Sequence, residues 1–188
     1  MLAPERRQLR PLGRLSFAVL ALVGEGGAGP HDLVRMMRQG RLYWSSAESQ
    51  WYAEPKRLER LGYLASRKEP GKTRERTVYL LTDAGRDALR TWISDPSALP
   101  RIQSEAIVRL LGADLAESDD ALLASLQAIR TDIAHVAAQL DLAEAAAATL
   151  PHRERYLRLV HQLGRGLLRA HEEWLDGVER ELASERRQ

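Results

Sequence analysis

Residues 45–62 gather the side chains of this chain that are best suited to binding nucleic acid. At helical spacing, Ala47, Trp51, Leu58 and Leu61 fall on one side of this stretch. The other sides carry short polar or cationic residues, namely Ser46, Ser49, Gln50, Ala53, Lys56, Arg57 and Arg60. Hydroxyl, amide and guanidinium groups bind phosphates and base edges without an enclosing pocket. The pattern is typical of a recognition helix, although a solvated amphipathic helix shares it.

The same stretch has a start signal and a stop signal. Ser45 and Glu48 have the Ser-x-x-Glu spacing of a capping box, in which each side chain satisfies a backbone donor of the first turn. Gly62 can adopt the left-handed conformation that ends a helix. We therefore predict one helix from Ser45 to Gly62, with Trp51 as a core residue. Pro55 inside it costs about 3 kcal/mol and is expected to kink it.

The two halves of the 188-residue chain differ in charge. Residues 1–95 hold 17 Lys and Arg against 11 Asp and Glu, a net charge of +6, whereas residues 96–188 hold 11 against 15, a net charge of −4. Only 3 of the 28 cations are lysine, and arginine pairs bidentately with phosphates and guanine edges. Charge therefore favours an anionic partner for the first half.

Composition is that of a soluble globular protein, with 44% hydrophobic and 29% charged residues. The absence of cysteine excludes disulfides and thiolate chemistry and fits a reducing cytoplasm. Four arginines before the apolar run 15–23 imitate a secretory signal, but the run is short, Gly24-Glu25-Gly26 follows it where small-x-small residues should lie, and cleavage would remove a helix that the next domain needs. No stretch approaches the roughly 20 apolar residues of a membrane span. We expect a cytoplasmic protein that does not contact the membrane.

The elements flanking the candidate recognition helix have a recognisable order. Apolar spacing and glycine or proline boundaries predict helices at 15–23 and 30–38 before it. Two β-forming stretches, 63–68 and 77–81, follow it on either side of a Pro-Gly turn, and a helix at 83–93 comes after them. Helix, helix, cationic helix, hairpin and helix is the order of a winged helix-turn-helix domain.

The predicted hairpin has a basic tip. Lys68, Lys72, Arg74 and Arg76 lie within nine residues around the turn. Such a tip can lie along a phosphate backbone. It can equally be a solvated tip whose charge only aids solubility.

The second half carries two apolar heptad patterns separated by Pro151. The first contains Leu122, Leu126, Ile129, Ile133, Val136, Leu140, Ala143 and Ala147. The second contains Tyr156, Val160, Leu163, Leu167, Ala170, Trp174, Val178 and Leu182. Long helices joined by so short a turn are expected to lie antiparallel.

These two seams can close on each other within one chain or pair with the same hairpin of a second chain. We favour a homodimer, because a seam exposed on one hairpin is hard to bury alone. The candidate dimerisation residues are Leu126, Ile129, Ile133, Val136, Leu140, Val160, Leu163, Leu167 and Trp174. The expected fold is mainly α with a small β-hairpin: a winged helix-turn-helix domain at 1–95 and an antiparallel helical hairpin dimerisation domain at 96–188.

The sequence resembles the PadR family of bacterial transcriptional regulators, in its longer branch with a helical C-terminal domain. The resemblance rests on Trp44, Ser49-Gln50-x-Tyr52, Lys56-Arg57-Leu58-Glu59-x-x-Gly62, Val78-Tyr79-x-Leu81-Thr82-x-Ala84-Gly85-Arg86 and Leu89-x-x-Trp92. It implies a homodimer whose winged helices bind a palindromic operator, usually as a repressor. The chain departs from the family pattern at Ala53, where proline is usual, at Pro55, and at Pro30-His31, where the family has Gly-Tyr.

We assign DNA contacts on this basis. Ser49, Gln50 and Arg57 are the candidates for reading bases, since Gln pairs with adenine and Arg with guanine. Ser46 lies on the same polar face. The candidates for phosphate contacts are Tyr52, Lys56, Lys72, Arg74 and Arg76.

The sequence offers no catalytic motif, metal ligand set or cofactor motif, so we do not expect an enzyme. The five histidines include no pair at the four-residue spacing of a helical metal site. A small-molecule effector could bind near Trp92 or Trp174. The alternative function is that of a winged helix that docks proteins and does not bind specific DNA.

Overall fold

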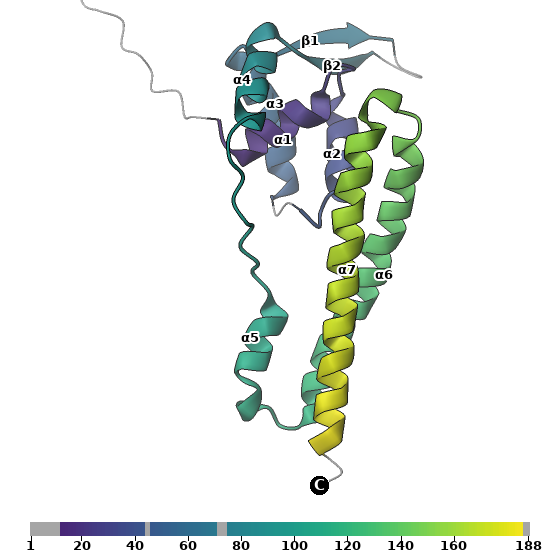
Figure 1. The fold of residues 1–188 in the computed structure, drawn as a ribbon. Helices are drawn as coiled ribbons and strands as arrows, with labels where there is room; N and C mark the ends of the chain where they lie inside the picture. Colours follow the sequence, from purple (N-terminus) through teal and green to yellow (C-terminus); the bar gives the residue numbers. More distant parts are fainter. Residues whose placement is uncertain (1–11, 44–45, 71–74, 186–188) are drawn as a thin grey trace, which may run out of the picture. The chain divides into compact units, whose positions relative to one another are not determined.

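The computed structural model describes residues 12–43, 46–70 and 75–185. The chain divides into two compact units, Met1–Ala98 and Leu99–Gln188. The first unit contains three helices, then a two-stranded sheet, then a fourth helix (Figure 1). These elements are α1 (Arg14–Val23), α2 (Pro30–Gln39), α3 (Glu48–Arg60), β1 (Leu64–Glu69), β2 (Arg76–Leu81) and α4 (Asp83–Ile93).

One apolar cluster holds the first unit together. Val19 and Leu20 of α1, Leu33 of α2 and Leu58 of α3 are fully buried in it. Trp51 is 2% exposed, which confirms its predicted place in the core. Burying side chains of this size from several helices gives each helix one fixed apolar side, and the opposite side is left to solvent.

The strands β1 and β2 pair antiparallel, from Leu64 opposite Leu81 to Glu69 opposite Arg76. Ala28 adds a single bridge to Tyr79, with backbone N···O distances of 3.0 and 2.9 Å. The preceding Gly27 has φ +74°, and a Cβ there would lie 2.8 Å from the Tyr79 carbonyl oxygen. Only glycine fits where the loop between α1 and α2 approaches the hairpin so closely.

The helix α3 begins later than predicted. It starts at Glu48 with Ala47 as the N-cap, and no side chain caps it; Ser45 lies outside the described residues. The Glu48 carboxylate pairs with Arg38 of α2 at 2.6 Å instead of turning back to its own helix, and Ala47 is extended. The predicted stop is confirmed, because Gly62 has φ +82° directly after the C-cap Leu61. Pro55 lies inside the continuous helix on its buried side.

The second unit consists of α5 (Glu105–Leu111), a short 3-10 helix η1 (Ala113–Leu115), α6 (Asp119–Ala147) and α7 (Pro151–Glu185). The helix α5 is short, because Ser104 caps its start and Gly112 ends it. The long helices α6 and α7 pack against each other as the predicted antiparallel hairpin. The predicted fold class is therefore confirmed.

The packing seam of the hairpin differs between its two helices. On α6 the buried residues are Leu122, Leu126, Ile133, Val136, Leu140 and Ala147, so the predicted α6 seam closes on α7 of the same chain. On α7 the buried residues are His161, Gly164, Leu168 and Leu175, which lie one position away from the predicted row. The predicted row is instead exposed at Tyr156 (65%), Val160 (45%) and Leu163 (59%). The helix α7 thus carries a second apolar row beside the one that packs on α6. The first half of this second row is exposed, and its later residues Leu167, Trp174, Val178 and Leu182 are half-buried.

Candidate nucleic-acid interface

The solvent side of α3 carries the predicted polar face. Ser49, Gln50, Ala53 and Lys56 are exposed, and Ser46 is exposed just before the helix. Tyr52 is 36% exposed, and its ring meets the edge of His31 of α2 at a centroid distance of 6.2 Å. Together with the Arg38–Glu48 ion pair, this contact supports the N-terminal half of α3 from α2.

A groove with a volume of about 640 Å³ lies between α3 and the hairpin. Its lining is Ala53, Lys56, Glu59 and Arg60 from α3 and Ser66, Arg67, Lys68, Thr77 and Tyr79 from the strands. Four of these side chains are cationic and one is acidic. Glu59 accepts a hydrogen bond from the Ser66 hydroxyl, so its charge is directed at the hairpin. Such a lining suits an anionic backbone that follows the groove.

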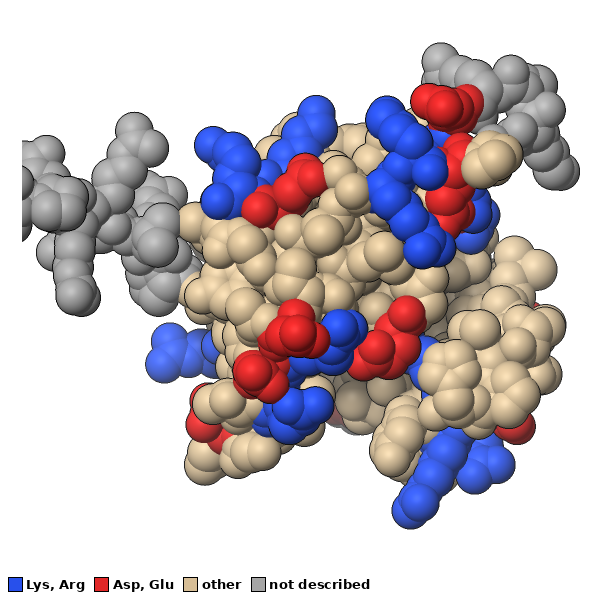
Figure 2. All heavy atoms as spheres, turned by 90° about the horizontal axis from the view of Figure 1, so that it is seen from above, with Lys and Arg blue, Asp and Glu red and all other residues tan. Residues whose placement is uncertain are grey.

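The strands partly neutralise their own cations. Glu69 pairs with Arg67 at 2.6 Å and with Arg76 at 3.0 Å, and Arg76 also lies 3.9 Å from Asp32 of α2. The hydrogen bond from Arg67 is the main reason that the pKa of Glu69 lies below its ordinary value, with Arg76 adding to it. In Figure 2, lysine and arginine side chains stand beside acidic ones and do not form one unbroken patch. Lys68, which donates to Thr77 Oγ1 at 2.9 Å, faces the groove without an acidic partner among the described residues.

Arg57 has different surroundings from the other predicted contact residues. Its side chain is 28% exposed and its guanidinium binds Glu54 of the same helix and Ser16 of α1. Of the residues predicted to contact phosphate, Lys56 lines the groove, and Arg60 and Arg67 line it without having been predicted to do so. Arg60 follows Lys56 by four residues and therefore shares its side of the helix, a signal already present in the sequence.

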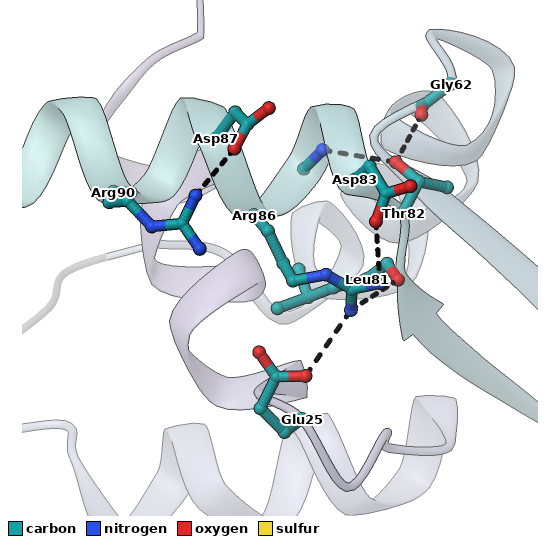
Figure 3. Close-up of polar contacts among 9 residues, drawn as sticks. Glu25, Gly62, Leu81, Thr82, Asp83, Arg86, Asp87 and Arg90 are labelled. Carbon is teal, nitrogen blue, oxygen red and sulfur yellow. Dashed lines mark hydrogen bonds and ion pairs between the residues drawn. The ribbon is translucent and has the colours of Figure 1, made fainter.

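A joint of polar contacts links the end of β2 to the start of α4 (Figure 3). Thr82 Oγ1 donates to the Gly62 carbonyl at 2.6 Å and accepts from the Gly85 amide at 3.1 Å. Arg86 donates to the Leu81 carbonyl at 3.1 Å and pairs with Asp83 at 3.1 Å and Glu25 at 3.4 Å. These contacts give the Thr82-x-Ala84-Gly85-Arg86 sequence a structural role, because its residues join the hairpin to α4 and do not form a ligand site.

The remaining predicted site residues are dispersed. Lys72 and Arg74 lie outside the described residues. Trp92 is 41% exposed and stacks on Phe17, with ring centroids 4.7 Å apart. Trp174, Leu167 and Ile129 are half-buried in the second unit. Across the described residues, no cluster of three or more His, Asp or Glu side chains could hold a metal ion, and no helix has the length and hydropathy to span a membrane.

The elements of the first unit define a winged helix-turn-helix domain. The model of the family described as "Transcriptional regulator PadR-like family" matches residues 19–91, which run from α1 to the end of α4. The resemblance to PadR proteins seen in the sequence is confirmed over this region.

Solved structures and a curated relative agree with this assignment. The chain is 30% identical over 89 residues to the negative transcriptional regulator PadR of Bacillus subtilis, and the match covers 46% of this chain and 48% of that protein. It resembles the crystal structure of B. subtilis PadR in complex with operator DNA, with a TM-score of 0.71, 23% identity, and 89% and 97% of the two chains covered. It also resembles B. subtilis PadR in complex with p-coumaric acid, with a TM-score of 0.63, 21% identity, and 90% and 98% covered.

Proposed function

We propose that this chain is a sequence-specific, double-stranded-DNA-binding regulator of transcription. The observation that carries the proposal is the exposed polar face of α3, continuous with the cationic groove between α3 and the hairpin. A helix fits the major groove of B-DNA, and the adjoining hairpin then lies along the sugar-phosphate backbone.

The residues divide into two roles under this proposal. Ser49 and Gln50 read base edges, because their short hydrogen-bonding side chains are exposed at the start of α3, the end of a recognition helix that contacts bases. Phosphate contacts come from Tyr52 and from the cations of the groove, namely Lys56, Arg60, Arg67 and Lys68. Lys72 and Arg74 extend this set along the hairpin, and Arg76 contributes less because Glu69 already pairs with it. Ser46 contacts the backbone at the entry to α3.

The functional unit under this proposal is a homodimer on a palindromic operator. The exposed apolar side chains of α7, among them Tyr156, Leu159 and Leu163, form the surface that a second copy would bury. Apolar residues at this spacing on a long helix are typical of helix-helix interfaces, and a two-fold dimer would place two copies of α3 on two half-sites.

Repression relieved by a small molecule is the mode of regulation that we propose. The name of the B. subtilis relative, a negative regulator, supports repression, and the complex of that protein with p-coumaric acid supports an aromatic acid as effector. Trp92 and Trp174 remain the candidate contacts, because both indole rings are partly exposed and can stack on an aromatic ring.

Selection of duplexes from a random-sequence library tests the proposal, followed by binding measurements on the selected and a scrambled duplex over a salt series. We expect a palindromic consensus and an affinity that falls steeply with salt, because each phosphate contact contributes about −0.9 to the slope of log K against log salt. Equal affinity for both duplexes would contradict the proposal and favour a protein-docking module.

A further inference from the structure

A polar cluster of one buried and two partly buried residues joins α1 to α3. Ser16 of α1 is 2% exposed, and the side chains of Glu54 and Arg57 are 12% and 28% exposed. Burying an ion pair is costly unless its geometry is good and its remaining hydrogen-bonding groups are satisfied. The cluster meets that condition.

The Ser16 hydroxyl uses its full hydrogen-bonding capacity. It donates to Glu54 Oε1 at 2.7 Å and accepts from the Gly13 amide and from Arg57 Nη2, both at 3.0 Å. A hydroxyl has one donor and two lone pairs, so its orientation is fixed by three partners. One buried serine therefore holds α1 to two residues of α3.

The pair between Glu54 and Arg57 is bidentate. Arg57 donates from Nη2 to Glu54 Oε1 at 2.8 Å and from Nε to Oε2 at 2.9 Å. The planar fork of arginine matches a carboxylate in a way that a lysine ammonium does not. Burial disfavours ionised Glu54, but the hydrogen bonds from Arg57 and Ser16 and the charge of Arg57 outweigh it, so the pKa of Glu54 lies below its ordinary value. The carboxylate is thus charged at neutral pH.

Pro55 lies between the two partners. Proline has no amide hydrogen, so α3 lacks the backbone hydrogen bond that residue 55 would donate to the Trp51 carbonyl. Glu54 directly precedes Pro55 and Arg57 follows it by two residues, so their ion pair lies at the C-terminal end of the weakened turn.

We propose that Ser16, Glu54 and Arg57 form a positioning clamp that sets the pose of α3 against α1, and that Arg57 acts through Glu54 and not on DNA. The clamp rests on the proposed DNA-binding function, since its role is to aim Ser49 and Gln50 at base edges. It revises our sequence-based prediction that Arg57 reads a base.

Binding of four proteins tests the clamp: the wild type, Ser16→Ala, Arg57→Lys and Lys56→Ala. The probes are the duplex that the wild type selects from a random library and a scrambled duplex of equal length. Thermal unfolding by circular dichroism fixes a temperature at which all four proteins are folded, and the salt slope is measured for each. Ser16→Ala removes only a buried hydroxyl, and Arg57→Lys keeps the charge and loses the fork.

We expect Ser16→Ala and Arg57→Lys to lower the ratio of selected to scrambled affinity about ten-fold, the effect of misplacing a base contact, with the salt slope unchanged. Lys56→Ala, the matched control on the exposed side, should weaken both duplexes alike and reduce the slope by about 0.9 per protomer. A purely structural role would leave the ratio unchanged.

Results that contradict the clamp can be distinguished from results that contradict the proposed function. Wild-type ratios for both Ser16→Ala and Arg57→Lys overturn the clamp and leave the proposed function standing. A fifth variant, Arg57→Ala, is measured in the same way: if it reduces the salt slope while Arg57→Lys retains it, Arg57 is a direct phosphate contact and the clamp is also overturned. Failure of the wild type to select any duplex overturns the proposed function itself and the clamp with it.

Discussion

Lys56 and Arg57 are neighbours in the chain and carry the same charge, yet one is exposed to solvent and the other is bound by protein groups. Lys56 is exposed on the wall of the groove, whereas Arg57 turns inward to Glu54 and Ser16. One helical step of about 100° separates a side chain that faces solvent from one that supports the fold. At the residue scale, charge alone therefore does not identify a contact with DNA.

Gln50 provides a direct test of base reading. Replacing it with alanine removes the amide that can pair with adenine, and we expect the variant to tolerate other bases at one position of each half-site. The loss at that position should be about 1 to 3 kcal/mol. Repeating the library selection with Gln50→Ala measures it, and Gln103→Ala, at an exposed position of the second unit, is the matched control. An unchanged consensus would remove Gln50 from the reading set.

His161 is a buried histidine whose Nδ1 has no hydrogen-bond partner among the described residues. Burial lowers the pKa of its imidazole; Glu144 raises it and Arg165 lowers it further, and the net shift is downward. The unfolded chain takes up a proton near the ordinary pKa of about 6.5, where the folded chain resists protonation. Stability of the second unit should therefore fall as the pH drops below about 6.5.

Two variants of His161 distinguish the effect of its protonation from the cost of burying its unpaired polar atom. His161→Leu and His161→Gln both remove the titrating ring. The part of the decrease in the free energy of unfolding that comes from His161 between about pH 6.5 and 5 should therefore disappear in both variants. His161→Leu should also be more stable at neutral pH by about 1 kcal/mol, because it buries no unsatisfied polar group. Denaturant unfolding at several pH values measures both effects. A wild-type pH dependence in both variants would assign it to other groups.

At the scale of elements, tertiary contacts decide how the helices and strands meet. Glu48 pairs with Arg38 of α2 and so does not cap its own helix, and Gly85 lets α4 lie directly on the turn after α3. A Cβ at Gly85 would lie 2.1 Å from the Tyr63 carbonyl oxygen, a clash between backbone and side chain that no rotamer relieves. The joint between α4 and the hairpin thus depends on this glycine.

We expect Gly85→Ala to destabilise the first unit by roughly 1 to 3 kcal/mol or more through overpacking. Gly26→Ala is the matched control, because a Cβ there meets no atom within 4 Å. Thermal unfolding measures the melting temperatures of the two variants, whose substitutions lie in the same unit. Equal melting temperatures would show that α4 can shift to admit the methyl group.

At the scale of the whole molecule, α7 has one apolar row more than a single hairpin requires. The buried row of α7 packs against α6. Two ion pairs also join these helices: Arg130 pairs with Asp176 at 2.7 Å, and Arg165 pairs with Glu144 at 3.1 Å. The outer row, with Leu163 59% exposed, is left for the proposed partner copy. Exposed apolar rows of this length mark interaction surfaces in soluble proteins.

Leu163→Glu should weaken the proposed homodimer. A two-fold interface contains each substitution twice, so the loss of buried apolar area and the added charge should raise the dissociation constant about a hundred-fold or more. Sedimentation equilibrium measures it, and Gln162→Glu places the same charge on an exposed neighbour as a control. A monomeric wild type, or a dimer indifferent to Leu163→Glu, would reject this interface.

Local patterns in the sequence were enough to predict much of this protein. Periodic apolar residues and the Gly62 stop predicted the order and type of the elements, because helix and strand signals act over a few residues. The motif residues indicated the resemblance to PadR proteins. The same reasoning placed Trp51 in the core and left Lys56 and Gln50 on the exposed side of α3.

Only the tertiary structure decided which of several equivalent partners each side chain takes. Ser16 and Arg57 are 41 residues apart, so nothing local in the sequence indicates that they share a hydrogen bond. Likewise the two apolar rows of α7 differ by one residue, and packing against α6 selects one of them. Long-range contacts arise from the way whole helices pack, and that packing determines where α3 points its exposed polar face.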